Sequence, residues 1–107
     1  MKKLAVYSLL LLMILSGCNF NRRLVKKGDK KFDRGEYQVA IERYHKALNK
    51  GKFPGEVNFK IGESYRVSNR LEEALPYYQA AIRNGFNDDE VRFYLAFFTS
   101  FRPELFR

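Results

Sequence analysis

Residues 40–48 read AIERYHKAL, and residues 74–82, 34 positions later, read ALPYYQAAI. The same offset places Gly28 on Gly62. A fixed period of this size indicates an array of helical repeats, because each helix pair must stack on the next one to bury its apolar face. The sequence therefore predicts an all-α fold built from repeated helix pairs.

Small and aromatic residues share one helix face in each unit. Steps of four and three separate Ala40, Tyr44 and Ala47, which puts the three side chains on one side of a helix. A glycine inside a helix costs about 1 kcal/mol relative to alanine, so Gly28 and Gly62 are expected to have a packing role. The residues predicted to pack between helices are Gly28, Ala40, Tyr44, Ala47, Gly62, Tyr65, Ala74, Tyr78, Ala81 and Ala96.

This pattern resembles the tetratricopeptide repeat, which has a small residue early in its first helix and an alanine, aromatic, alanine series in its second. The resemblance covers residues 21–54 and 55–88 as two repeats, and residues 89–107 as the first helix of a partial third repeat with a C-terminal tail. It implies a short right-handed solenoid of two and a half repeats. Lys31 departs from the pattern, because the family has an aromatic residue there.

The expected helices lie near residues 21–34, 37–50, 56–67, 70–84 and 88–101. Gly35, Gly51, Gly55 and Gly85 are expected in the turns between them. Asn87, followed three residues later by Glu90, resembles a capping box at the start of the last helix. Pro76 lies inside the fourth helix, where we expect one missing backbone hydrogen bond.

The first eighteen residues read MKKLAVYSLLLLMILSGC. A basic start, small residues at the end and an apolar run shorter than the about 20 residues of a membrane span are typical of a secretory signal. The quartet ending at Cys18 resembles the lipobox of bacterial lipoproteins, which implies cleavage between Gly17 and Cys18 and an acyl anchor on the Cys18 thiol. Residues 1–17 are then a signal peptide, and residues 18–20 are the lipidated N-terminus and a short linker. An ordinary signal peptide or a buried helix with an incidental cysteine is the alternative.

The residue after the cysteine is Asn19. In enteric bacteria an aspartate at this position resembles a signal for retention in the inner membrane. The resemblance therefore implies a location in the bacterial cell envelope, at the outer membrane and facing the periplasm.

The chain carries a formal net charge of +8, and its basic residues crowd the first repeat helix. One interpretation is contact with anionic lipid headgroups beside the anchor, worth about 1 kcal/mol per well-placed basic residue. A solvated helix face with local ion pairs is the other. A basic, aromatic-rich chain also suits nucleic acid, but export of the chain argues against that partner. The predicted membrane-surface patch consists of Arg22, Arg23, Lys26, Lys27, Lys30 and Lys31.

Residue types that carry catalysis are sparse in this sequence. His45 is the only histidine, and no serine or cysteine nucleophile stands near it in the sequence. Glu72 and Glu73 are adjacent, so they point in different directions around a helix and cannot form a converging acid pair. No metal-ligand cluster or glycine-rich phosphate loop is visible. We therefore expect no enzymatic activity, no cofactor, no metal and no small-molecule substrate.

In tetratricopeptide arrays the first helix of each repeat lines a concave groove, so the resemblance implies a partner site along these helices. Aromatic anchors with acidic flanks suit a helix or an extended peptide that carries apolar and basic residues. Ordinary packing between repeats is the alternative for each phenylalanine. The predicted groove residues are Val25, Asp29, Phe32, Asp33, Phe59, Glu63, Arg66, Phe93, Phe97 and Phe101.

The last predicted helix is apolar nearly all round, which indicates cover on more than one side. A second helix of the third repeat would provide it, but the sequence reaches Arg107 without one. A partner protein, a second copy, the membrane, or a continuation of the chain would each account for this. The expected function is a lipid-anchored adaptor that binds another envelope protein. The alternatives are a self-associating structural module and the N-terminal segment of a larger lipoprotein that links to peptidoglycan.

Overall fold

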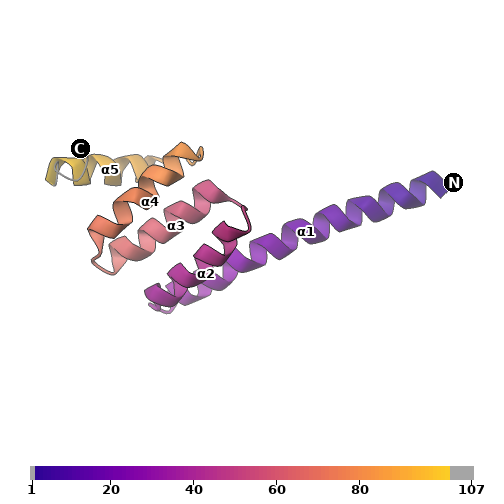
Figure 1. Cartoon of the computed structure of the whole chain (residues 1–107), viewed down its shortest axis with the longest axis horizontal. Helices are drawn as coiled ribbons and strands as arrows, with labels where there is room; N and C mark the ends of the chain where they lie inside the picture. Colours follow the sequence, from indigo (N-terminus) through magenta and orange to yellow (C-terminus); the bar gives the residue numbers. More distant parts are fainter. Residues whose placement is uncertain (1, 102–107) are drawn as a thin grey trace.

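The computed structural model describes residues 2–101, with the backbone alone for residues 13–21 and 101. These residues form an all-α structure (Figure 1). The helices of the described part are α1 (Lys2–Asp33), α2 (Tyr37–Asn49), α3 (Pro54–Val67), α4 (Leu71–Arg83) and α5 (Asp89–Phe101).

Helix α1 is far longer than the sequence pattern predicts. It begins at Lys2 instead of near residue 21, so the apolar start and the first repeat helix form one helix of 32 residues. The first half of α1 projects away from the other helices (Figure 1), and the described side chains of residues 2–12 are all exposed. Leucine, alanine and lysine favour helix, and no glycine or proline interrupts the run before residue 17.

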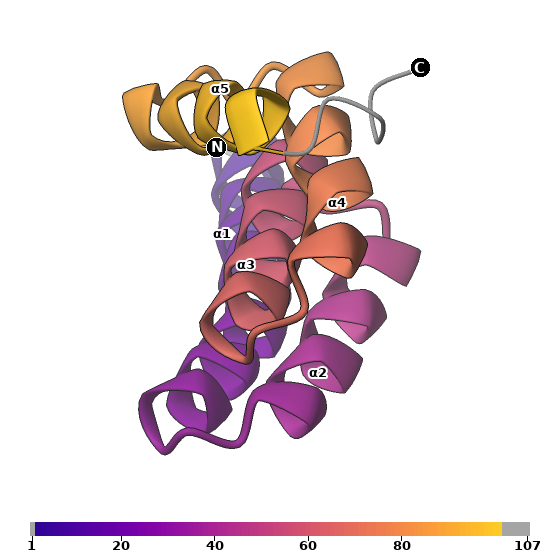
Figure 2. The ribbon, with the colours of Figure 1, turned by 90° about the vertical axis from the view of Figure 1, so that its left-hand side faces the viewer.

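The helices alternate between two layers. Seen from the side, α1 and α3 lie in one layer and α2 and α4 in the other, and α5 crosses the end of the stack (Figure 2). Each helix packs against the next one along the chain. The buried residues between the layers form one continuous core that runs from Val25 in α1 to Phe98 in α5.

Glycines and prolines lie at several of the helix ends, where their backbone properties are needed. Gly35, Gly51 and Gly85 have φ between 70° and 84°, a region in which a side chain would be strained. Pro54 is the first residue of α3, where its fixed φ suits the helix and its missing N–H is not needed. The expectation that Gly55 lies in a turn is wrong. It is buried inside α3, and a Cβ there would lie 2.9 Å from the Cβ of Phe86.

The start of α5 and the proline inside α4 can both be compared with the sequence-based expectation. The backbone N–H of Glu90 donates to the Asp88 side chain at 2.9 Å, so Asp88 caps α5 and the capping box assigned to Asn87 is wrong. Helix α4 runs through Pro76 without a break.

Candidate functional site

A close glycine–tyrosine contact occurs in both helix pairs. A Cβ at Gly28 would overlap the ring of Tyr44, and one at Gly62 would lie 3.0 Å from ring carbons of Tyr78. Both rings are fully buried. A side chain at Gly28 would force the Tyr44 ring to move, and one at Gly62 would crowd the Tyr78 ring, so this close contact gives both glycines a packing role in helix interiors.

Each buried tyrosine also donates a hydrogen bond to a carboxylate on the helix it packs against. The hydroxyl of Tyr44 donates to Oδ1 of Asp29, and that of Tyr78 donates to Oε1 of Glu63, both at 2.7 Å. The two pairs are 34 residues apart and therefore equivalent. Burial first, and then these hydrogen bonds, raise the pKa of both hydroxyls well above the ordinary tyrosine value, so both remain protonated donors into the alkaline range.

A cation completes each of these networks. The ammonium of Lys60 lies 2.8 Å from Oδ1 of Asp29. The guanidinium of Arg66 binds Glu63 through both carboxylate oxygens, at 2.6 and 3.2 Å. The charges of Asp29 and Glu63 are therefore largely neutralised inside the chain, and a partner would meet them as hydrogen-bonded networks and not as free anions.

A pocket opens between these networks on the face formed by α1 and α3. Its volume is about 370 Å³. Five of the ten predicted groove residues come together in its lining. The lining residues are Asp29, Phe32, Asp33, Tyr44, Phe59, Lys60 and Glu63.

A second pocket, of about 300 Å³, lies between the end of α3 and α5. Its lining is more apolar than that of the first, and Arg66 lies over the ring of Tyr94 with its guanidinium carbon 4.2 Å from the ring centroid. Since Glu63 lines the first pocket and Arg66 the second, their ion pair separates the two. The residues around the second pocket are Arg66, Asn69, Leu71, Phe93, Tyr94, Phe97 and Phe98.

Comparison with protein-family models, with curated proteins and with solved structures found no match for this chain. Among the described residues, no group of three or more histidine, cysteine, aspartate or glutamate side chains is placed to hold a metal ion. None of the described helices combines the length and the apolar character needed to cross a bilayer.

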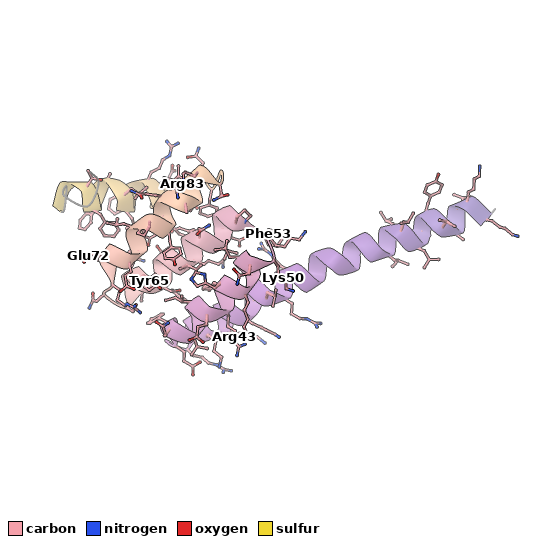
Figure 3. The ribbon with its side chains drawn as sticks, in the orientation of Figure 1. Arg43, Lys50, Phe53, Tyr65, Glu72 and Arg83 are labelled. Atoms are coloured by element: carbon pink, nitrogen blue, oxygen red, sulfur yellow. The ribbon has the colours of Figure 1, made fainter. Side chains whose placement is uncertain are left out.

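The packing residues predicted from the repeat are buried in the two helix pairs. This holds for both glycines, for the alanines at 40, 47, 74 and 81, and for Tyr44, Tyr65 and Tyr78. Tyr65 lies inside the helix pair (Figure 3), where its ring stacks on that of Tyr77 with 5.5 Å between centroids. Ala96 is the exception, because it is exposed. Its face of α5 corresponds to the glycine faces of α1 and α3, and no described helix packs against it.

The groove prediction needs two corrections and one addition. Val25 is only 1% exposed, so it belongs to the core and cannot contact a partner. The ring of Phe59 is half-buried and stacks on Phe86, with 4.9 Å between centroids, so it forms the floor of the pocket more than its rim. Phe98, which was not predicted, joins Val91 as a buried core residue of α5. The spacing of residues 91, 94, 95 and 98 could have revealed that helix face.

The remaining groove residues of α5 differ in how they are placed. Phe93 and Phe97 are 64% and 45% exposed, and their rings stack with 6.1 Å between centroids. The side chain of Phe101 lies outside the described residues, as do those of Gly17 and Cys18.

The predicted basic patch also needs correction, because two of its members form ion pairs. Arg22 binds Glu56 at 2.6 Å, and its guanidinium lies 4.7 Å from the ring centroid of Phe53, which Figure 3 shows at the turn before α3. Lys31 lies 3.1 Å from Glu36. Arg22 and Glu56 are 34 residues apart, so opposite charges at equivalent repeat positions could have revealed the first pair from the sequence.

Proposed function

We propose that this chain is a non-enzymatic adaptor that binds a peptide or helix of another protein along the face formed by α1 and α3. The 34-residue period supports this proposal, because stacked helix pairs create extended concave surfaces for partners. The resemblance to tetratricopeptide repeats points to the same helices. The observation that carries the proposal is the pocket in which five predicted groove residues from two helices meet.

The chemistry of the pocket defines the ligand that we propose. Asp33 is exposed and makes no hydrogen bond or ion pair with another described side chain. Its carboxylate can therefore accept a hydrogen bond from a lysine or arginine of the partner. Phe32 and Phe59 offer half-buried rings beside it. A ligand with a basic residue next to an apolar residue would pair with the carboxylate and pack on the rings. The ion pair would mainly orient the ligand and raise its association rate.

The first eighteen residues support a place for this adaptor in the bacterial envelope. We propose that Cys18 carries the acyl anchor and that the repeats face the periplasm from the outer membrane. Several acyl chains, at about 0.8 kcal/mol per buried methylene, anchor a protein stably, whereas a single chain does not. Assembly of a secretion, pilus or outer-membrane complex is the kind of task that fits a small adaptor held at this surface.

Site-specific photo-crosslinking in the native host tests the binding face. A photoreactive phenylalanine analogue replaces Phe32 or Phe97 in turn, and Arg43 and Arg83, labelled in Figure 3 on α2 and α4, serve as control positions. We expect an adduct of one defined mass from the two phenylalanine positions only. The charge reversal Asp33→Lys should lower the yield from Phe97. Equal adducts from the control positions, or a yield that Asp33→Lys leaves unchanged, would contradict the proposed face.

Self-association is the second candidate function, and the exposure of Phe93 and Phe97 on α5 favours it. Two copies that pack through these rings would bury apolar surface at about 25 cal/mol per Å². Light scattering of the full chain in mild detergent measures this directly. A dimer that Phe93→Ser with Phe97→Ser converts to a monomer supports it, and a monomer at every concentration rules it out.

A further inference from the structure

Four basic residues share the outer face of α1. Positions 23, 26, 27 and 30 follow the helical spacing i, i+3, i+4 and i+7, so their side chains point the same way. All four are exposed, and none forms a hydrogen bond or ion pair with another described side chain. We call this set the basic stripe, and its members are Arg23, Lys26, Lys27 and Lys30.

The basic stripe lies opposite the packed face of α1. Val25 and Gly28 on that packed face are buried, and Phe32 is half-buried. Compared with the patch expected from sequence, the stripe loses Arg22 and Lys31 to ion pairs. The result is four uncompensated positive charges along about 10 Å of one helix.

We propose that the basic stripe binds an anionic phospholipid surface, so that α1 lies along the membrane instead of standing upright on it. Two observations select lipid as the occupant. The stripe is complementary in charge to anionic headgroups. It also begins five residues after Cys18 on the same helix, beside the acyl anchor that we propose there. This proposal rests on that anchor but is independent of the groove and its ligand.

The orientation has a consequence for the first pocket. Asp29 and Phe32 reach the pocket from the side of α1 that faces away from the stripe, and Asp33 lies between the two sides. A carboxylate at that border repels anionic headgroups. With the stripe on the membrane, the pocket would therefore remain open to the solvent.

Resonance energy transfer on the chain acylated at Cys18, in vesicles, distinguishes the two orientations. A donor dye is attached at Arg34→Cys, an exposed position beyond the stripe, and the acceptor is carried by lipid headgroups. The acylated Cys18 has no free thiol, so the dye reacts at position 34. Position 34 is 16 residues beyond position 18, so an upright α1 would hold the donor about 24 Å farther out than a flat one. We expect strong transfer in vesicles that contain phosphatidylglycerol and weak transfer in pure phosphatidylcholine. Salt at 1 M should weaken the transfer, because it shortens the Debye length to about 3 Å.

A matched pair of charge variants tests the stripe itself. Lys26→Gln, Lys27→Gln and Lys30→Gln should shift the equilibrium between flat and upright helix by about 100-fold toward upright, from about 1 kcal/mol per basic residue. The control removes the same charge through Lys46→Gln, Lys50→Gln and Lys52→Gln, at exposed positions in α2 and the turn after it, and should change little. Equal transfer in neutral and anionic vesicles, or an equal loss in both variants, would overturn the proposal.

Discussion

Helices α3 and α5 are equivalent in the 34-residue repeat but differ in what covers them. Gly62 of α3 is buried under the ring of Tyr78, whereas Ala96, the equivalent residue of α5, is exposed. Glu63 accepts a hydrogen bond from that tyrosine, whereas the equivalent Phe97 is 45% exposed. The comparison teaches that the repeat pattern alone does not bury a residue. Burial also requires the second helix of the pair, which α4 provides for α3.

The largest expected effect comes from removing a buried ring in a covered pair. Tyr78→Ala deletes a fully buried side chain and a hydrogen bond to Glu63, so we expect the free energy of unfolding to fall by about 3–5 kcal/mol. Phe93→Ala removes a ring of comparable size from α5, where it is 64% exposed, and should change stability by about 0.5 kcal/mol or less. Urea unfolding followed by circular dichroism measures both. Similar losses would mean that α5 is covered after all.

The two regions should differ in whether glycine or alanine is the more stable residue. Gly28→Ala pushes a methyl group into the ring of Tyr44, and overpacking of this kind costs about 1–3 kcal/mol even though alanine is the better helix former. Ala96→Gly introduces a glycine into an exposed helix interior and should cost about 1 kcal/mol. Thermal unfolding of Gly28→Ala and of Ala96→Gly tests both preferences: glycine should be the more stable residue at position 28 and alanine at position 96. A stabilising effect of Gly28→Ala would refute the close contact.

Alkaline pH should weaken the covered pairs selectively. The folded state raises the pKa of Tyr44 and Tyr78 above 10.0, so their contribution to stability is complete below pH 10 and is lost as pH rises further. Each tyrosine should lower the free energy of unfolding by about 1 kcal/mol between pH 10 and pH 11, because the unfolded side chain is already half deprotonated at pH 10. The double variant Tyr44→Phe with Tyr78→Phe should show a flatter pH profile. A variant profile that matches the original would assign the alkaline loss to other groups.

The smallest effect is expected at the ion pair between neighbouring repeats. Arg22→Gln removes a half-exposed guanidinium from Glu56 and from the ring of Phe53. Surface pairs of this kind contribute about 0.2–1 kcal/mol. Unfolding of Arg22→Gln, of Glu56→Gln and of the double variant gives the coupling energy of the pair. A coupling energy near zero would mean that only the core and Lys60 hold α1 to α3.

Much of the fold followed from local chemistry in the sequence. Glycines at 35, 51 and 85 separate the helices, and the repeated glycine, alanine and tyrosine positions define the buried contacts of both pairs. The continuous helix α1 did not follow, because its apolar start has the pattern of a signal peptide and its second half has the pattern of a repeat helix. The apolar and basic segments are both compatible with helix, and only the backbone shows that they join.

The candidate site was predictable only in part. The pocket residues at positions 29, 32 and 33 lie one to two turns beyond Val25 on α1. Periodicity cannot show that the core ends after Val25 and that the pocket begins at position 29. Similarly, the neutralisation of Asp29 by Lys60 joins two side chains that are 31 residues apart in sequence and lie on different helices. Helical spacing predicts which residues share a face. It does not predict which neighbour covers that face.

The difference between the covered pairs and the open last helix is tested most directly by thiol accessibility. Single cysteines replace Ala47, Ala81 or Ala96 in the full chain, with Cys18→Ser to remove the native thiol, and their rates of modification are compared. Ala47 and Ala81 are 0% exposed, so cysteines there should react only through transient opening, at least about 100-fold more slowly than at position 96 if opening costs about 3 kcal/mol. The rates are compared at a concentration at which light scattering shows a monomer, because a second copy on α5 would also protect position 96. A cysteine at position 96 that reacts as slowly as the other two in the monomer would show that α5 is covered within the chain and would contradict the open face.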